Sequence, residues 1–471
     1  MDGILNLLNY LDDVLYYPIL VVVLVAAGLY FTLRTGLVQL RMLGECIRVV
    51  LEKPAGKDQV SSFQALMVST ASRVGTGNII GISTAICLGG PGSVFWMWMI
   101  ALIGGSTAFI ESTLAQIYKR KTSHGLSYGG PAYYIETALR SRGVACAFAL
   151  FLILTYAGGF NLLCSYNLQS TFEVYSFYDP ATSPWIIGGI EALLVGYCLL
   201  GGGRRIITMT SVMVPVMGGI YILAALATTV MHISYLPDVL GMIFADAFDF
   251  QAILGGIGGS CLMYGVKRGL FSNEAGIGSA PNAAASADVS HPVKQGLVQM
   301  LSVFIDTMLV CTATAFLCLT SGVGITKEAA GAPYVQAASI AAFGEAGPIL
   351  ITVSMILFAF TTLIGNLYYV DNNLSFLHHG APGKSFMAAF RVLCVLIIFV
   401  GAGLPMSAAW AIADILMAFM ALINIPSIMI LGGIAIRAMK DYERQKKEGK
   451  NPVFRAKDIG LDTASLDFWK D

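Results

Sequence analysis

The stretch RVGTGN, residues 73–78, interrupts an apolar segment that covers residues 62–88. A membrane-spanning helix needs about 20 mostly apolar residues, and this stretch places two glycines and three polar side chains near the middle of one. Backbone can unwind at membrane depth only where it is buried in protein or lines a cavity. The stretch therefore predicts a broken helix at a central site.

A second interruption, KRGLFSNEAGIGS at residues 267–279, lies in the apolar segment 251–288. The two interruptions lie in the second and the seventh predicted spans, five spans apart, so they would enter the membrane from opposite sides. Interrupted helices at matching positions of two inverted halves indicate the binding site of a secondary transporter. The pair therefore predicts a transporter whose site lies between the two breaks.

Composition identifies the chain as a membrane protein surrounded by lipid. Of its 471 residues, 56% are hydrophobic and 12% are charged, whereas soluble domains carry about 25% charged residues. The formal net charge is zero, so no basic excess favours nucleic acid as a partner. Eleven apolar segments are predicted as spans, near residues 14–33, 62–88, 92–118, 144–172, 185–201, 207–230, 251–288, 294–320, 346–372, 385–403 and 406–438.

The distribution of charge predicts the orientation. Cytoplasmic loops of membrane proteins are enriched in Lys and Arg, and the loop 35–61 contains four such residues while the segment 441–471 contains seven. The alternate loops are acidic and contain one lysine, Lys327. Residues 1–13 contain no Lys or Arg, so no cleaved signal peptide is expected. We expect a multi-pass protein of the prokaryotic plasma (inner) membrane, with the N-terminus outside and the C-terminus in the cytoplasm.

The first interruption favours an anionic ligand such as a carboxylate. The second half-helix would begin with unpaired N–H groups at the positive end of its dipole, and Asn78 could add a directional hydrogen bond. The alternative is close helix packing through glycine.

The second interruption offers hydrogen-bond acceptors and a carboxyl group. Backbone carbonyls freed around residues 271–273 would receive an ammonium group or a cation. Glu274 is ionisable at membrane depth, which makes it a functional candidate. The alternative is a structural ion pair with Arg268 or Arg73.

Thr361, Thr362 and Asn366 lie in the segment 346–372. Hydroxyl oxygens suit a hard cation such as Na⁺, although hydroxyls in a helix also bond back to the preceding turn. The sequence contains no P-loop, GxSxG or HExxH motif. We therefore expect neither an enzymatic activity nor an organic cofactor.

Three stretches resemble the alanine or glycine:cation symporter family (sodium/alanine symporters). They are VGTGNIIGISTAICLGGPGSVFWMW at 74–98, GVKRGLFSNEAGIGSAPNAAASA at 265–287 and FAFTTLIGNLYYVD at 358–371. The likeness covers about residues 60–440 and implies an all-α fold of the leucine-transporter type, in the amino acid–polyamine–organocation superfamily. That fold has two inverted five-helix repeats, here preceded by one peripheral helix.

The resemblance also implies an organisation of the chain. We expect an N-terminal part at 1–61, with an extracellular N-terminus, a peripheral first helix and a cytoplasmic loop. The first repeat would cover 62–230, an extracellular loop 231–250, the second repeat 251–440 and a cytoplasmic tail 441–471.

The resemblance to the family also implies which residues form the site. The substrate carboxylate would bind Thr76, Gly77 and Asn78. The ammonium group would lie near the backbone of Phe271 and Ser272 and near Thr362, with Phe160 as a pocket wall. Na⁺ would be held by the carbonyls of Ala71, Val74 and Phe358 and the hydroxyls of Thr361 and Thr362.

One position departs from the family pattern. Family members usually have a Gly-Trp pair where this chain has Gly365-Asn366, which implies a roomier and more polar pocket. We therefore expect Na⁺-coupled symport of alanine, glycine or glutamine by alternating access. A proton-coupled symporter or a passive amino acid exchanger on the same fold is the alternative.

Overall fold

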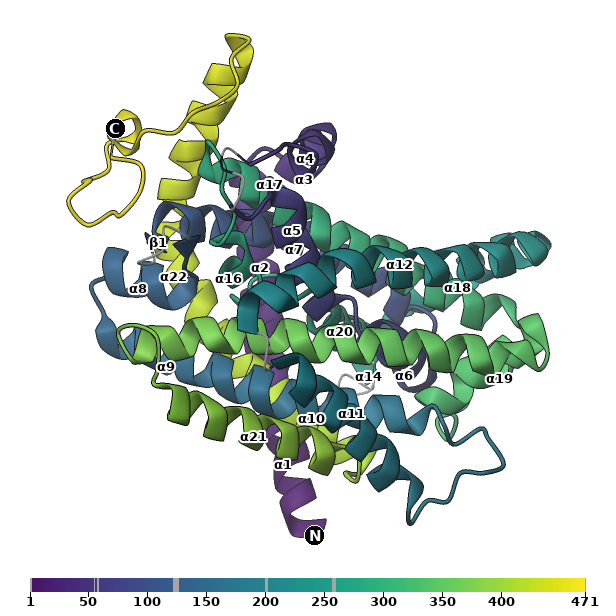
Figure 1. Ribbon diagram of the computed structural model, residues 1–471. Coiled ribbons are helices and arrows are strands. Elements are labelled where there is room, and N and C mark those ends of the chain that lie inside the picture. Colours follow the sequence, from purple (N-terminus) through teal and green to yellow (C-terminus); the bar gives the residue numbers. More distant parts are fainter. Residues whose placement is uncertain are drawn as a thin grey trace.

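The computed structural model describes residues 2–54, 56, 59–121, 127–199, 202–255 and 260–470 (Figure 1). It is almost entirely helical, and its described strands are the two-residue antiparallel pair β1 (Arg120–Lys121) and β2 (Ser127–Tyr128). The N-terminal part contains α1 (Asp2–Val14), the π-helix η1 (Leu15–Leu20), α2 (Val21–Arg34), α3 (Val38–Arg41) and α4 (Leu43–Val50).

The next part of the chain contains α5 (Ser62–Arg73), η2 (Gly77–Gly81), α6 (Ile82–Gly89), α7 (Ser93–Ile117), α8 (Pro131–Ala138), α9 (Arg142–Ile153), η3 (Leu154–Gly159), α10 (Phe160–Ser170), α11 (Ser183–Leu199) and α12 (Gly202–Met231). The segment 231–250, expected as a loop, contains the short helix η4 (Ile233–Tyr235) and α13 (Leu236–Ala247).

The remaining elements are α14 (Phe250–Gly255), α15 (Cys261–Asn273), α16 (Pro281–Ala284), α17 (Pro292–Val303), η6 (Phe304–Cys311), α18 (Thr312–Thr320), α19 (Ala332–Phe343), α20 (Ala346–Leu377), α21 (Lys384–Gly401), α22 (Met406–Lys447) and η7 (Ala456–Ile459). In this part, too, most of the chain is helical, as the apolar segments predicted.

Seven helices or continuous helical runs in the described residues are long and apolar enough to cross a membrane. Three shorter apolar helices, Val21–Arg34, Gly77–Gly89 and Ser183–Leu199, overlap the predicted spans 14–33, 62–88 and 185–201. The segment 251–288 contains α15 and α16, separated by a non-helical stretch. The count of eleven spans and the division into repeats at 62–230 and 251–440 stay predictions.

Both predicted interruptions are present. α5 begins at a capping box, in which Ser61 accepts from the Gln64 N–H and Gln64 accepts from the Ser61 N–H, and it ends at Arg73. The chain then turns through residues 74–76 before η2 begins at Gly77. α15 ends at Asn273, and Glu274 takes a left-handed conformation with φ 53°. Each break therefore lies where glycine and polar residues interrupt the apolar pattern.

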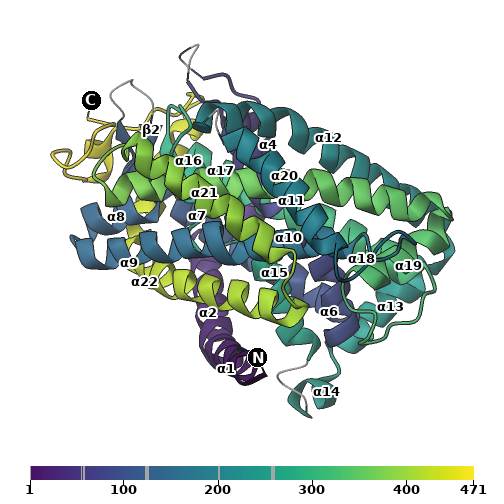
Figure 2. The ribbon, with the colours of Figure 1, turned by 60° about the horizontal axis from the view of Figure 1, so that its bottom comes forward.

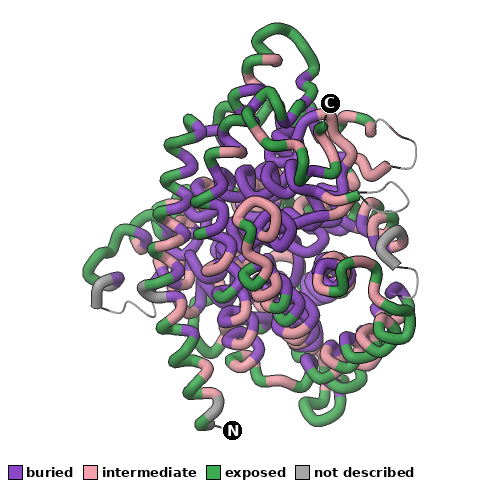
Figure 3. The backbone as a smooth tube through the Cα atoms, turned by 90° about the vertical axis from the view of Figure 1, so that its left-hand side faces the viewer, coloured by how far each residue is buried: buried purple, intermediate pink, exposed green. Residues whose placement is uncertain are grey.

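The buried residues lie in the centre of the molecule, and exposed ones lie mainly at its periphery (Figure 3). α7 packs along α15 and α17, whereas α20 packs along α5 and α12. α21 lies along α11 and α10 (Figure 2). Large apolar side chains such as Leu193 of α11 and Val392 of α21 are exposed, which suits helices that face lipid.

A folded C-terminal tail, residues 448–470, returns along the end of α22 (yellow in Figure 1). The Trp469 indole N–H donates to the Gln116 carbonyl at 2.9 Å, and the Phe454 N–H donates to the Ser290 carbonyl at 2.9 Å. The Lys119 ammonium lies 4.7 Å from the centre of the Phe468 ring. The tail therefore joins the end of α7 to the segment that precedes α17.

Candidate functional site

Asn78 joins the two interruptions. Its side-chain oxygen accepts from the Gly75 N–H at 2.8 Å, which supports the turn after α5. Its amide nitrogen donates to Ser272 Oγ at 3.0 Å and to Asp306 Oδ1 at 2.6 Å. Ser272 also donates to the Asp306 carboxylate at 2.6 Å. The Asn78 side chain is thus fully engaged by the protein in this conformation.

Two glycines allow the elements around the breaks to approach one another. A Cβ atom on Gly75 would overlap the Thr362 hydroxyl of α20, and a Cβ atom on Gly77 would overlap the Phe271 ring of α15. Neither position has room for a side chain. Gly75 and Gly77 therefore do allow close helix packing, the alternative function of the first interruption, and they do so at the candidate site.

Glu274 follows the end of α15 and is 1% exposed. Its carboxylate accepts from Ser279 Oγ at 2.6 Å and from Ser72 Oγ at 3.4 Å. The suggested ion pair with Arg268 or Arg73 is absent from the described residues. Arg268 pairs with Asp414 at 2.6 Å, and Arg73 donates to the Gln299 carbonyl at 3.2 Å.

Of the residues predicted for Na⁺, Ala71 and Thr362 meet where the end of α5 approaches α20, whereas the Thr361 hydroxyl lies 3.1 Å from the Met217 sulfur of α12. The Thr362 hydroxyl donates to the Ala71 carbonyl at 3.2 Å, and the Thr361 hydroxyl donates to the Phe358 carbonyl at 3.1 Å. Ala71, Val74, Phe358, Thr361 and Thr362 are all buried. The Thr361 contact is also a hydrogen bond to the preceding turn of its own helix, which is the alternative to a role as a cation ligand.

The chemistry of this oxygen set fits a monovalent cation. It contains three backbone carbonyls and two hydroxyls, all neutral oxygen donors of the kind that hard cations take. Within the described residues, no group of three or more His, Cys, Asp or Glu side chains is placed to hold a metal ion. The donor set thus suits Na⁺ better than a transition metal.

A small closed cavity lies between the two breaks. It has a volume of about 10 Å³ and is lined by Ser72, Arg73, Gly75, Thr76, Gly77, Phe160, Cys164, Phe271, Glu274 and Thr362. A cavity of roughly 10–15 Å³ holds about one water molecule. The cavity in this conformation is therefore too small for an amino acid, which would have to expand it.

Five of the eight predicted substrate residues line this cavity: Thr76, Gly77, Phe160, Phe271 and Thr362. Asn78, Ser272 and Asn366 do not. Asn366 is fully buried behind the cavity wall, where it accepts from Ser72 Oγ at 2.7 Å and donates to Asn161 Oδ1 at 3.0 Å.

Four residues that the sequence did not identify contribute to the site. Ser72 and Arg73 line the cavity next to the recognised motif, and Cys164 lines it from α10. Asn167, also on α10, donates to the Thr76 hydroxyl at 3.1 Å. Ser72 and Arg73 adjoin or begin the first interruption in the sequence, and the predicted wall residue Phe160 belongs to α10, but nothing in the sequence distinguishes Cys164 or Asn167 on that helix.

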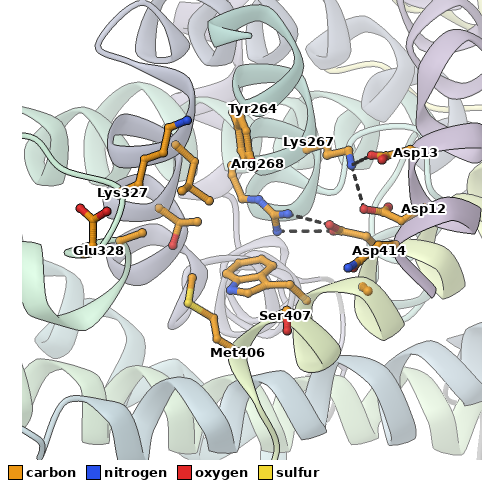
Figure 4. Close-up of a pocket in the computed structure, with 16 residues that line it drawn as sticks. Asp12, Asp13, Tyr264, Lys267, Arg268, Lys327, Glu328, Met406, Ser407 and Asp414 are labelled. Atoms are coloured by element: carbon orange, nitrogen blue, oxygen red, sulfur yellow. Dashed lines mark hydrogen bonds and ion pairs between the residues drawn. The ribbon is translucent and has the colours of Figure 1, made fainter. Parts of the chain in front are cut away.

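A larger pocket, here called the vestibule, opens near the N-terminal helix (Figure 4). It has a volume of about 630 Å³. Lys327 and Glu328 lie on one side, and Asp12, Asp13 and Lys267 lie on the other (Figure 4). Lys267 pairs with Asp12 of α1 at 2.8 Å. The vestibule is thus lined by both acidic and basic side chains.

An aromatic partition separates the vestibule from the closed cavity. The Arg268 guanidinium, paired with Asp414, lies 3.7 Å above the Trp410 ring. The Trp410 ring meets the Phe271 ring at 4.9 Å between centres, and Phe271 meets Phe160 at 4.8 Å. Phe271 and Phe160 also line the cavity. Opening this side of the site therefore requires these packed rings to separate.

The arrangement of helices matches that of a solved transporter. The crystal structure of MhsT in complex with L-phenylalanine superimposes with a TM-score of 0.52, covering 89% of this chain and 94% of that one, at 14% sequence identity. The predicted fold class, an all-α polytopic membrane protein of the leucine-transporter type, is confirmed.

The chain belongs to the sodium:alanine symporter family, which matches residues 1–456. It is 40% identical to the amino-acid carrier protein AlsT of Bacillus subtilis, covering 100% of this chain and 99% of that protein. It is 41% identical to the probable sodium/glutamine symporter GlnT of the same organism, covering 98% and 96%. The resemblance seen in residues 60–440 is thereby confirmed and extends further toward both ends.

Proposed function

We propose that this chain carries a small neutral amino acid across the plasma membrane together with Na⁺. The observation that carries the proposal is the cavity between the two breaks. On one side it meets the start of a half-helix at Gly77, and next to it lies the neutral oxygen set of Ala71 and Thr362. The family is that of sodium:alanine symporters, and one relative is named a sodium/glutamine symporter.

The substrate carboxylate would dock on the half-helix N-terminus that begins at Gly77. Oriented N–H groups in a site of low dielectric attract an anion. The ammonium group would meet the last carbonyls of α15, which have no following helical turn to bond. Asn78 and Ser272 would support these contacts from behind, because their side chains bond to each other and to Asp306.

Na⁺ would bind the carbonyls of Ala71, Val74 and Phe358 and the hydroxyls of Thr361 and Thr362. Bound there, it would connect the end of α5 to α20. A cation that fastens these two elements would stabilise the substrate-binding conformation, which is how its gradient could drive uptake.

Alternating access would begin at the vestibule, which the charge pattern of the loops assigns to the outside. Separation of Arg268, Trp410 and Phe271 would admit substrate to the cavity. Their closure, as in this conformation, would occlude it. Opening toward the other face, which contains the tail, would then release it.

The deciding experiment is uptake into proteoliposomes with an imposed Na⁺ gradient, using a competition panel of alanine, glycine, glutamine and their amides. We expect concentrative uptake of at least one of the three acids and no competition by amides, which lack the carboxylate. Uptake driven by a proton gradient alone would favour the proton-coupled alternative. Counterflow without any concentrative uptake would indicate a passive exchanger.

A further inference from the structure

Glu191 is a carboxyl group near the centre of α11, where the proposed Na⁺ and substrate sites make no use of it. It is 5% exposed, whereas its neighbours Leu193 and Leu194 are 73% and 54% exposed. α11 therefore turns its leucines toward lipid and Glu191 inward. The helices packed against α11 are α10, α12, α20 and α21.

The Glu191 carboxyl lacks the partners that an ionised form needs. Within the described part of the chain, neither of its oxygens has a partner with full hydrogen-bond geometry. The Ser165 hydroxyl of α10 lies close enough to act on the carboxyl but also falls outside that geometry. Among the described residues, the other titratable group near it is the Cys164 thiol. No charged residue of α12, α20 or α21 acts on it among the described residues.

This environment favours the protonated, neutral form of the Glu191 carboxyl. An unpaired carboxylate at membrane depth is strongly disfavoured, so such a group holds a proton or takes a cation. The polar side chain that faces Glu191 belongs to one serine, whereas a cation site needs several oxygen donors. The observations therefore favour a proton over Na⁺.

Glu191 lies directly behind the wall of the substrate cavity. Cys164, which lines the cavity, precedes Ser165 on α10. Phe160 of the same helix also lines the cavity, and Asn167 bonds to Thr76 in the first break. Any movement of α10 that enlarges the cavity for an amino acid will also move Ser165 relative to Glu191.

We propose that Glu191 is a proton-binding site linked to the substrate cavity through α10, so that transport responds to pH. In the conformation of this structure the carboxyl is protonated. When α10 moves and water enters between α10 and α11, the O–H bond breaks and the proton passes to water, leaving the carboxylate. The link to transport rests on the proposed function, but proton binding by Glu191 does not.

The first test uses the whole protein in detergent or liposomes without substrate. A hydrophobic carbodiimide, which reacts with protonated carboxyls, is added across a pH series, and the adduct is located by mass spectrometry. We expect an adduct on Glu191 that declines about tenfold over two pH units of its titration. We expect no such adduct in the Glu191→Gln variant. Absence of the adduct at every pH would overturn the proposal, as would protection by Na⁺ at fixed pH.

The second test measures amino acid uptake at a fixed Na⁺ gradient from about pH 5 to about pH 9, the range in which such a group would titrate if shifted. Wild-type uptake should change with pH, and Glu191→Gln should flatten that profile. Glu173→Gln, which alters an exposed loop carboxyl, should keep the wild-type profile. An unchanged profile in Glu191→Gln would refute the link. If no variant transports any amino acid, the proposed function fails, and the labelling result still decides whether Glu191 binds a proton.

Discussion

At the scale of single residues, Thr362 offers the sharpest test of the proposed Na⁺ site. Its hydroxyl reaches across from α20 to the Ala71 carbonyl, whereas the Thr361 hydroxyl also bonds within its own helix. Thr362→Ala should remove an oxygen ligand worth about 1.5–3 kcal/mol. The Na⁺ concentration for half-maximal uptake should therefore rise roughly tenfold or more.

The matched control is Thr155→Ala, which removes a buried hydroxyl that bonds only to the preceding turn, at Phe151. It should leave the Na⁺ activation curve in place, and Thr362→Ser should restore most of the affinity. An unshifted curve for Thr362→Ala would remove this residue from the cation site.

The contacts of Asn366 lead to a second prediction about a single residue. Because its side chain bridges Ser72 and Asn161 behind the cavity, a larger residue there must push Ser72 toward the substrate. Asn366→Trp, which restores the bulk usual in the family, should exclude glutamine while sparing alanine and glycine. The measurement is the ranking of competitors against labelled substrate, and an unchanged ranking would count against the assignment.

At the scale of elements, the packing of the broken helix against α15 can be tested through a pair of residues. Gly77→Ala puts a methyl group into the Phe271 ring, so transport should fall strongly even if the protein folds. Adding Phe271→Leu should recover part of the activity by making room. Gly219→Ala, on α12, is the control, since no atom lies within 4 Å of the added methyl. Equal loss in the single and double variants would show that the clash is not the cause.

The two breaks could be predicted because their signal is local: glycine and polar residues interrupt an apolar run. What the breaks contact could not be predicted from the residues alone. Asn78 bonds to Asp306, which is 228 positions away along the chain, and Asn167 reaches Thr76 from a different helix. The small size of the cavity, which leaves Asn78, Ser272 and Asn366 outside its wall, likewise depends on how whole helices pack.

At the scale of the whole molecule, the orientation in the membrane stays a prediction of the charge pattern. A cysteine at Lys327 should react with an impermeant maleimide in intact cells, and one at Lys447 should react only after permeabilisation. Both positions are exposed. The native cysteines are buried or half-buried, so the background should be low. The reverse labelling pattern would overturn the proposed orientation.

The aromatic partition contains Trp410, whose intrinsic fluorescence can report on its opening. Trp410, one of five tryptophans, is 5% exposed and lies between a guanidinium group and the Phe271 ring. When the rings separate, its indole should become more exposed to water, and its fluorescence should shift to longer wavelength. A variant that keeps Trp410 as its sole tryptophan would then report the opening of the vestibule side in real time, without an attached dye.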